Sequence, residues 1–410
     1  MSDIYTDKQR ALLRLWQEDK LRRINLLEGS VSSGKTWISL VLWAFWVATM
    51  PRDGSFLMVA KTLTSLRRNC LDLLAELVGT ANFSYSLSRK EGALFGRRIY
   101  LEGVNDARAE SKIRGMTLSG AYCDEVTLFT KDFFSMLLSR LRQPGAKLIG
   151  TTNPDSPYHW LKEDYMDKGA SGEIDMLTVK FLIDDNTFLP PEYVENAKKE
   201  HVGVFYDRFI RGEWVIANGL VYPNFDESKH VFDYIPVNPA KDDGLYYISI
   251  DYGTQNPCSM GLWRVADGKA MRIAEYYHDG RKTRHQMTDE EYYSALETLA
   301  GDKVIQYVVI DPSAASFIAT IKRHGVFSVK KGSNDVLDGI RVTAALLSTG
   351  RILFDRGCVD TIKEFRTYSW DDKATSDTVV KENDHAMDDI RYFCYTVLRR
   401  EWHWDDWAVT

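Results

Sequence analysis

Several common features are missing from this sequence, and each absence narrows the class of protein. No apolar run reaches the length of a membrane span, and the residues before position 26 are charged and show no signal-peptide pattern, so we expect a soluble cytoplasmic protein with no membrane partner. The 410 residues contain only 5 cysteines, none in C-x-x-C spacing, which indicates neither a disulfide framework nor a zinc knuckle. The formal net charge is -6 rather than positive, so any contact with nucleic acid must be local.

A glycine-rich stretch, LLEGSVSSGKTW, is the most informative segment that is present. Four of its residues fit the pattern G-x-x-x-x-G-K-[ST]: Gly29, Gly34, Lys35 and Thr36. A short apolar strand precedes the stretch and an apolar helix follows it, which is the order that a phosphate-binding loop requires. Loop amides bind the β- and γ-phosphates, the lysine adds a positive charge, and the threonine hydroxyl binds magnesium. We therefore predict a site for ATP with Mg²⁺ at residues 29–36, Ser30 and Ser33 included; a glycine-rich turn before a core helix is the alternative.

Strand-like and helical runs alternate after the loop, which indicates a parallel sheet with crossover helices. The expected strands cover residues 55–61, 97–103, 120–125 and 146–154. One ends at Asp124 and Glu125, where an ATPase needs one carboxylate for magnesium and another to orient the attacking water; a solvated charge pair is the alternative. Another ends at Thr151, Thr152 and Asn153, which we expect to couple hydrolysis to movement unless they only form a polar turn.

Two further residues of this region have open roles. Gln9 stands at a predicted helix start, where its amide can either read adenine or face solvent as a surface residue. Arg114 lies in a loop-like stretch beside a glycine. This position suits an arginine finger acting in cis or in trans, or else a salt-bridged or DNA-facing arginine.

The chain length predicts two domains, because a single hydrophobic core stops growing at about 250–300 residues. We expect an α/β fold: a P-loop ATPase domain of RecA-like type over residues 1–216, with a small helical lid at about 155–216. A linker rich in Gly, Pro and Asp follows over residues 217–244, and a second domain occupies residues 245–410.

Carboxylates gather at three points of the second domain. Asp251 and Asp311 each end a predicted strand, and the head of a helix carries His385, Asp388 and Asp389. On that helix His385 and Asp388 share one flank, away from the apolar stripe. Hard oxygen ligands with at most one imidazole suit two Mg²⁺ or Mn²⁺ ions, which can activate water and hold the leaving oxygen of a phosphodiester. Each aspartate taken alone fits a turn or a helix cap equally well.

The order of these motifs along the chain resembles one family. The motifs are GSVSSGKT, KIRGMTLSGAYCDE, GTTNP, DYG, IDPS, KGSNDVLDGIRVTAALLSTGRI and KENDHAMDDIRY. Together they resemble the large terminase subunit of tailed bacteriophages, in its PBSX-type branch, over nearly the whole chain. The resemblance implies a packaging ATPase joined to a nuclease of RNase H-like fold, which translocates viral double-stranded DNA into a procapsid in the host cytoplasm and cuts the concatemer. It also implies the portal protein and the small terminase subunit as partners. The subunits are expected to form a ring on the portal, and the chain free in solution to be a monomer or an oligomer.

The resemblance also implies roles for individual residues. It makes Lys35 and Thr36 the phosphate-loop pair, Asp124 and Glu125 the magnesium-binding and water-activating acids, and Thr151 to Asn153 the coupling motif. It makes Asp251, Asp311 and Asp388 the nuclease metal ligands, with His385 as a candidate fourth. Asp389 stands where the family usually has alanine, so it stays open which carboxylate of the helix binds metal. If Asp389 is only a solvent-side neighbour of Asp388, we expect it to be dispensable for cutting DNA.

Two other functions stay open on the sequence alone. A repair-type ATP-dependent DNA helicase and nuclease shares the phosphate loop but carries further helicase motifs in a second RecA-like domain. A non-catalytic DNA-binding homologue keeps the folds without the chemistry. The acidic tail, residues 401–410, carries Trp402, Trp404 and Trp407; we expect it to dock on the portal or another packaging partner, unless it packs on its own domain.

Overall fold

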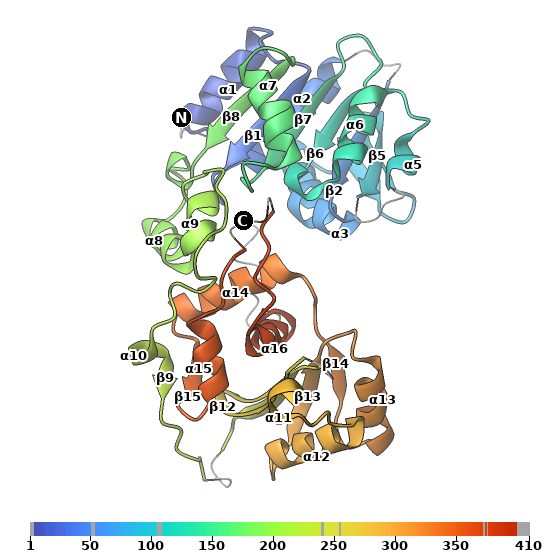
Figure 1. Cartoon of the computed structure of the whole chain (residues 1–410). Coiled ribbons are helices and arrows are strands. Elements are labelled where there is room, and N and C mark those ends of the chain that lie inside the picture. Colours follow the sequence, from blue (N-terminus) through green and yellow to red (C-terminus); the bar gives the residue numbers. More distant parts are fainter. Residues whose placement is uncertain are drawn as a thin grey trace. The chain divides into compact units, whose positions relative to one another are not determined.

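The computed structural model describes residues 4–50, 54–104, 109–238, 242–253, 256–371, 374 and 376–399. Contacts divide the chain into two units: the first runs to Val194 and includes Tyr206–Ile216, and the second comprises Glu195–Phe205 and the residues from Ala217 onward. Figure 1 labels the helices and strands of both units. The tail at 401–410, with its three tryptophans, lies outside the described residues.

The first unit is built on an eight-stranded sheet with the order β3-β4-β5-β2-β6-β7-β1-β8. Its strands are β1 (Ile24–Gly29), β2 (Ser55–Ala60), β3 (Phe83–Ser86), β4 (Glu91–Leu94), β5 (Arg97–Gly103), β6 (Leu118–Cys123), β7 (Lys147–Thr152) and β8 (Met176–Phe181). From β5 to β8 all neighbours are parallel, whereas β3 and β4 are antiparallel additions at one edge. Parallel strands end at the same edge of a sheet, so the loops after β1, β6 and β7 meet there.

Helices pack on both faces of this sheet. They are α1 (Asp7–Gln17), α2 (Lys35–Thr49), α3 (Leu63–Leu66), α4 (Asp72–Val78), α5 (Ala109–Ile113), α6 (Lys131–Arg140) and α7 (Asp167–Ala170), with π-helical turns at Arg67–Leu71 and Lys162–Met166 and 3₁₀ turns at Val126–Leu128 and Ile183–Asp185. The residues of α8 (Pro191–Glu200) and α9 (Gly203–Phe209) are divided between the two units. In β2, Phe56 and Met58 belong to the core under α2, while Leu57 and Val59 belong to the core under α6. This alternation follows from the two-residue period of a strand.

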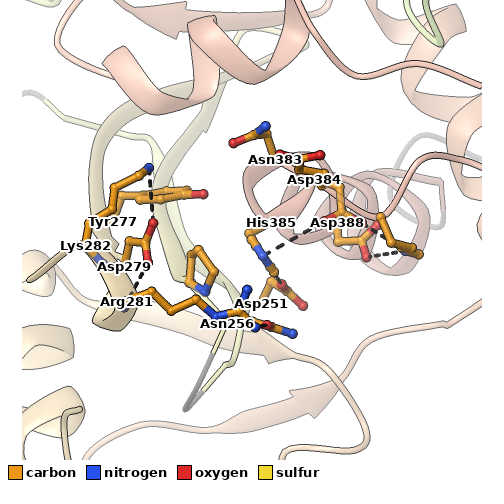
Figure 2. A pocket seen from close by; sticks show the side chains of 13 residues that line it. Asp251, Asn256, Tyr277, Asp279, Arg281, Lys282, Asn383, Asp384, His385 and Asp388 are labelled. Carbon is orange, nitrogen blue, oxygen red and sulfur yellow. Dashed lines mark hydrogen bonds and ion pairs between the residues drawn. The ribbon is translucent and has the colours of Figure 1, made fainter. Parts of the chain in front are cut away.

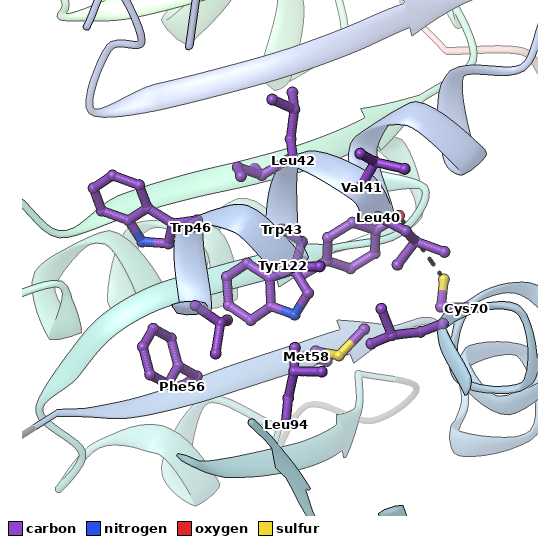
Figure 3. Packing of buried hydrophobic residues seen from close by; sticks show 14 of the residues in the cluster. Leu40, Val41, Leu42, Trp43, Trp46, Phe56, Met58, Cys70, Leu94 and Tyr122 are labelled. Atoms are coloured by element: carbon purple, nitrogen blue, oxygen red, sulfur yellow. Dashed lines mark hydrogen bonds between the residues drawn. The ribbon is translucent and has the colours of Figure 1, made fainter. Parts of the chain in front are cut away.

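Helix α2 is buried on most of its sides, and its aromatic residues fix its position (Figure 3). The ring of Trp43 is fully buried, with centroids 5.7 Å from Phe56 and 6.0 Å from Tyr122. A Cβ on Gly120 of β6 would lie 2.9 Å from Nε1 of Trp46, so only glycine lets the helix approach the sheet this closely. The packing therefore holds the amino end of α2, and with it the preceding loop, against the edge of the sheet.

The second unit contains a seven-stranded mixed sheet with the order β14-β13-β10-β11-β12-β15-β9. Its strands are β9 (Val231–Phe232), β10 (Leu245–Asp251), β11 (Cys258–Ala266), β12 (Lys269–His278), β13 (Ile305–Ile310), β14 (Val329–Lys331) and β15 (Ile352–Asp355). Strands β10, β11 and β12 form an antiparallel meander, and the outer neighbours on each side pair in parallel. The predicted domain limits stay a prediction; within the predicted linker, α10 (Glu227–His230) and β9 belong to this unit.

The two faces of the second sheet differ in chemistry. The remaining helices are α11 (Gly280–Thr283), α12 (Asp289–Ala300), α13 (Ala315–His324), α14 (Val336–Ser348), α15 (Val359–Phe365) and α16 (His385–Phe393), followed by a π-helical turn at Cys394–Leu398. Ile248 and Ile250 of β10 pack into an apolar core with α12 and α13. The alternate residues Tyr247 and Ser249 contact Phe393 and Asp389 of α16 instead. No helix among the described residues is long and apolar enough to cross a membrane.

A buried ion pair fixes α16 on this second face. Asp389 and Arg272 are both fully buried, with Arg272 Nη1 donating to Asp389 Oδ1 at 2.5 Å and Nη2 to Oδ2 at 3.1 Å. The hydroxyls of Ser249 and Ser259 donate to the same carboxylate. A Cβ on Gly261 would lie 2.0 Å from Arg272 Nη1, so this glycine makes the room for the guanidinium. The helix is thus held to β10, β11 and β12 by one charged network.

We predict that Asp389→Ala lowers the free energy of unfolding by about 3–5 kcal/mol, because it removes both short contacts of the buried Arg272 guanidinium and leaves it with the more distant Glu275, at 3.9 Å. Urea denaturation of the full chain measures the loss. The double variant Arg272→Met/Asp389→Leu, which removes both charges, should recover part of it. Arg356→Ala is the control: its ion pair with Asp233 is exposed, with side-chain exposures of 64% and 77%, so its removal should leave the denaturation midpoint nearly unchanged. An equally small effect of Asp389→Ala would contradict the importance of the pair.

Candidate active sites

The phosphate loop, residues 29–36, joins β1 to α2 in a preformed conformation. Gly29 has a φ of 131° and Gly34 a φ of 78°, both in the region that favours glycine. A Cβ on Gly29 would lie 1.9 Å from the carbonyl oxygen of Phe181 in β8, so no larger residue fits. Lys35 is buried at the start of α2, and its Nζ donates to Asn153 Oδ1 at 2.7 Å. The loop therefore already encloses the side chain of Lys35.

Two hydroxyl groups of the phosphate loop make no hydrogen bond within the described part of the chain. These are Ser30 Oγ and Ser33 Oγ, both buried. Buried polar groups are normally paired, so the loop suits a ligand that accepts hydrogen bonds. Burial lowers the pKa of Lys35, although the carboxylates of Glu125 and Asp124 oppose that shift. Thr36 is partly buried beside it. The donors of the phosphate loop fit a nucleotide phosphate.

The acidic pair after β6 lies next to the residues that end β7. Thr151 Oγ1 donates to Asp124 Oδ1 at 3.0 Å. The backbone N and the Nδ2 of Asn153 donate to Glu125 Oε2 at 3.2 and 3.1 Å. Glu125 has a φ of 55°, a left-handed conformation that a non-glycine residue keeps only where its surroundings fix it. Asn153 thus connects Lys35 with Glu125.

Asp124 is placed as a magnesium ligand would be. It is almost fully buried, and burial raises its pKa against the hydrogen bonds from Asn69 and Thr151 and the charge of Lys35. A buried carboxylate of this kind is stabilised by a bound cation, so the site fits Mg²⁺. The sequence analysis missed Asn69, whose Nδ2 donates to Asp124 Oδ2 at 3.0 Å, because no motif surrounds it. Thr152, by contrast, hydrogen-bonds Thr127 of the neighbouring 3₁₀ turn.

Gln9 lies against the phosphate loop. It is only 3% exposed, so the surface alternative is wrong. Its Oε1 accepts from the backbone N of Thr6 at 3.0 Å in a capping box of α1, and its Nε2 donates to the carbonyl oxygen of Gly34 at 3.4 Å. A contact between Gln9 and adenine stays a prediction.

Arg114 lies apart from the other residues predicted for ATP chemistry. It precedes the amino end of β6, whereas the phosphate loop and Asp124 lie at the carboxyl edge of the same sheet. Its carbonyl oxygen accepts from Arg140 at the end of α6, and its exposed side chain pairs with Glu110 at 2.9 Å. Within one chain β6 lies between Arg114 and the loop, which favours a role in trans over one in cis; the arginine finger itself stays a prediction.

The second unit holds an acidic cavity of about 400 Å³ (Figure 2). One side is formed by Asp251 at the end of β10 and by Asp384, His385 and Asp388 at the start of α16. The other side follows the connection after β12 and carries Asp279, Arg281 and Lys282. The loop before α16 adds Lys381. The structure therefore brings together three of the residues predicted as metal ligands: Asp251, His385 and Asp388.

The carboxylates of the cavity are paired with neighbouring basic side chains. His385 Nδ1 lies 2.8 Å from Asp251 Oδ2. Arg391 Nη2 donates to Asp388 Oδ1 at 3.0 Å, and Lys381 Nζ donates to Asp388 Oδ2 at 3.2 Å. Burial raises the pKa of Asp251 to about 6; the hydrogen bond with His385 opposes the shift and the charges of Asp388 and Asp389 add to it. Burial lowers the pKa of His385, but Asp251 outweighs it and the net shift is upward.

This set of side chains fits a hard divalent cation. Its donors are carboxylate oxygens and one imidazole, which suits Mg²⁺ or Mn²⁺ better than Zn²⁺. Burial raises the pKa of Asp251 and the charge of Asp388 adds to this shift; a bound cation would stabilise the ionised carboxylate against both effects. No group of three or more His, Cys, Asp or Glu side chains is close enough for metal binding among the residues described. Asp251 is paired instead with His385, and Asp388 with Lys381 and Arg391.

Asp311 and Asp389 do not line the cavity. Asp311 follows β13, which pairs in parallel with β10, so its backbone is next to that of Asp251. Its carboxylate accepts from the backbone N and the Oγ of Ser313, both at 2.8 Å. The sequence analysis made Asp389 dispensable if it lies on the solvent side of Asp388. This condition is wrong, because Asp389 is fully buried: one step along the helix turns its side chain away from the cavity and into the core. Asp388 is therefore the carboxylate of this pair that faces the cavity.

A buried glutamate that the sequence analysis missed holds the amino end of α16. Glu364 of α15 accepts from the backbone N of Ala386 at 2.7 Å and of Met387 at 3.2 Å, and Tyr277 donates to it at 2.7 Å. Burial raises the pKa of Glu364 to about 7, against these three hydrogen bonds. No local pattern marks it in the sequence, since it caps a helix from another segment.

Comparisons with known proteins agree with this arrangement. The family model for the phage terminase large subunit matches residues 22–204, and that for the terminase RNaseH-like domain matches residues 248–395. A comparison with curated protein sequences gives no significant match.

Three solved structures of one relative, the large terminase of a thermophilic bacteriophage, match the chain over most of its length. Its crystal form 2 has 36% identity and a TM-score of 0.89, covering 96% of this chain and 99% of its own. Its complex with ADP has 36% identity and a TM-score of 0.87, with 96% and 100% covered. Its complex with ATP-gamma-S has 36% identity and a TM-score of 0.86, with 96% and 99% covered. The predicted fold class and family are thereby confirmed: the chain belongs to the large subunits of phage terminases and combines their ATPase domain with an RNase H-like nuclease domain.

Proposed function

We propose that this chain is the motor and nuclease of viral DNA packaging. It hydrolyses ATP to translocate double-stranded DNA into a procapsid, and it cuts concatemeric DNA by two-metal phosphodiester hydrolysis. The observation that carries the proposal is the presence of two separate sites in one chain, a preformed phosphate loop in the first unit and an acidic cavity in the second.

The first site is proposed to bind ATP with Mg²⁺. The terminase of the thermophilic bacteriophage was solved with ADP and with ATP-gamma-S, which supports a nucleotide at the equivalent loop here. In this proposal Lys35 neutralises phosphate charge, Thr36 and Asp124 hold Mg²⁺, and Glu125 orients the attacking water. Gln9, which donates to the carbonyl oxygen of Gly34, is proposed to contact the base.

Thr151 and Asn153 are proposed to couple hydrolysis to movement. The hydroxyl of Thr151 donates to Asp124, and Asn153 contacts both Lys35 and Glu125. A change in charge at the γ-phosphate therefore acts directly on the end of β7. Coupling of this kind needs contacts that differ between the two states of the nucleotide, and these hydrogen bonds are the candidates.

The second site is proposed to cut DNA. Asp251 and Asp388 would hold the divalent ions, with Asp311 from the neighbouring strand end once its bonds to Ser313 open. Two such ions supply an activated water and charge stabilisation for the leaving oxygen. His385 orients Asp251 through their hydrogen bond, and Arg391 holds one oxygen of Asp388.

The partners of this machine are proposed from its chemistry and its family. Double-stranded DNA offers a dense, sequence-independent row of phosphates on which a motor can step. The portal protein of the procapsid, the small terminase subunit and further copies of this chain in a ring are the proposed protein partners. Arg114 could then act on the loop of a neighbouring subunit.

A packaging assay tests the function as a whole. Purified procapsids that carry a portal, ATP and linear DNA are mixed with the protein, and packaged DNA is scored by protection from an added nuclease. We expect ATP-dependent protection, and ATP hydrolysis that rises when procapsids are added. Duplex unwinding without protection would favour a repair-type helicase and nuclease, and neither hydrolysis nor cutting would favour a non-catalytic homologue.

Lys35→Ala should reduce ATP hydrolysis by at least about 100-fold, because it removes a preorganised positive charge from the phosphate site. Packaging should stop, while cutting of plasmid DNA with Mn²⁺ should continue, since the lysine belongs to the first unit. Lys20→Ala, at an exposed lysine that pairs with Glu18, serves as the matched control and should behave as wild type. Wild-type hydrolysis by Lys35→Ala would rule out this loop as the ATP site.

Asp251→Ala, Asp311→Ala and Asp388→Ala should each reduce plasmid cutting by at least about 100-fold, because each leaves the metal charge undercompensated. Pairs of these substitutions should add little further loss, since the residues act as one unit. Mn²⁺ should support cutting at least as well as Mg²⁺, and Ca²⁺ should not support it. Asp302→Ala, at an exposed carboxylate paired with Lys303, is the control. Robust cutting by Asp311→Ala would remove that residue from the site, and robust cutting by Asp251→Ala would reject the site itself.

A further inference from the structure

Lys381 is a basic side chain on the acidic wall of the nuclease cavity. Its Nζ lies 3.1 Å from Asp384 Oδ2 and 3.2 Å from Asp388 Oδ2. One ammonium group thus bridges two carboxylates at the amino end of α16, where a cation between them gains the most electrostatic energy. The side chain of Lys381 is 59% exposed, whereas those of Asp384 and Asp388 are 5% and 12% exposed. The ammonium group is therefore the solvent-exposed member of this cluster, and the two carboxylates are its buried members.

The two oxygens of Asp388 are not equivalent. Oδ1 faces Arg391, whose side chain is 1% exposed and passes over Gly339, where a Cβ would lie 2.4 Å from its Cγ. Arg391 is thus locked in the core and holds Oδ1 permanently. Oδ2 is the oxygen that a cation in the cavity can reach, and Lys381 occupies it. A divalent ion and the ammonium group therefore compete for the same atom.

We propose that Lys381 is an internal counter-ion that occupies the cation position between Asp384 and Asp388, so that a divalent ion binds there only after the lysine has moved away. This inference rests on the proposed nuclease function and describes how that site is regulated. A DNA phosphate entering the cavity gives the ammonium group another anionic partner and releases Asp388. Metal and DNA then favour each other's binding, and the metal affinity is held low until DNA is present.

Titration calorimetry with Mn²⁺ on the full chain, without nucleotide, tests the competition. The part of the Mn²⁺ binding heat that wild type shows and Asp388→Ala does not is assigned to the nuclease cavity. Lys381→Gln should bind Mn²⁺ at this site about tenfold more tightly than wild type, because a competing positive charge in direct contact has been removed. Lys381→Arg, which keeps the charge, should remain within about threefold of wild type.

Lys282→Gln is the matched control, because it also removes one positive charge from the wall of the cavity. Lys282 also lines the cavity and pairs with a carboxylate, Asp279, at 3.1 Å, but it does not contact the α16 acids through any bond that the structure records. Its substitution should change the Mn²⁺ affinity by less than about threefold. Equal gains from Lys282→Gln and Lys381→Gln would overturn the inference, because only the net charge would then matter.

A second measurement keeps the inference testable if heats are small. The melting temperature in EDTA should fall in Lys381→Gln, since two carboxylates lose their counter-ion, and the rise on adding Mn²⁺ should exceed that of wild type. If wild type and Lys381→Gln bind Mn²⁺ equally, the lysine does not compete and the inference fails while the nuclease site stands. If neither protein binds Mn²⁺ at a site sensitive to Asp388→Ala, both the inference and the proposed nuclease function fail.

Discussion

The ion pair between Arg272 and Asp389 is the constraint on which the second unit depends. Two opposite charges with no exposure are stable only together, so the pair fixes the depth and the rotation of α16 on the sheet. Asp388, one step earlier on the helix, is thereby turned to the cavity and faces it beside Asp251. A helix held only by apolar contacts could slide or rotate at small cost, and the cavity would lose its geometry. The buried charges on this face of the sheet therefore fix the position of α16 more than they raise the net stability of the fold.

The first unit positions its site by apolar packing and by short hydrogen bonds among the residues that the structure describes. There Trp43 and Trp46 pack the apolar helix α2 against the sheet. Short polar side chains follow the carboxyl ends of parallel strands and lie at one edge of that sheet. Asn153 joins Lys35 to Glu125, so the cation and the acid hold one another in place before any nucleotide binds. Two non-glycine residues of this site have a strained, left-handed backbone: Ser32 of the phosphate loop and Glu125.

The sequence predicted the parts of these sites that local patterns encode. The spacing of Gly29, Gly34 and Lys35 requires one backbone conformation, and the carboxyl ends of parallel strands lie at the same edge of a sheet. The residues of the first site could therefore be predicted from the sequence. The side on which Asp389 lies could not be predicted, because the helical period alone gives relative angles and not the partner that Arg272 supplies from a distant strand. The same holds for Glu364 and Asn69, which act on the sites from segments without a motif of their own. The position of Arg114 followed only from the parallel pairing of β6, β7 and β1, because Arg114 precedes the amino end of β6 and the phosphate loop follows the carboxyl end of β1.

Both sites share one electrostatic solution to a common problem. Carboxylates that bind a metal must be crowded and partly buried, and such groups repel one another when the metal is absent. In each unit a lysine at the junction of a loop and a helix stands among these acids: Lys35 at the start of α2, and Lys381 just before α16. The difference between the two lysines lies in their freedom. Lys35 is buried and stays where the phosphates will come, so it acts together with the ligand, whereas the more exposed Lys381 has to leave before its site can be filled. This asymmetry suits the proposed packaging motor, which would bind ATP at every step and cut DNA only at the end, because one site would have to be ready at all times and the other would have to stay closed.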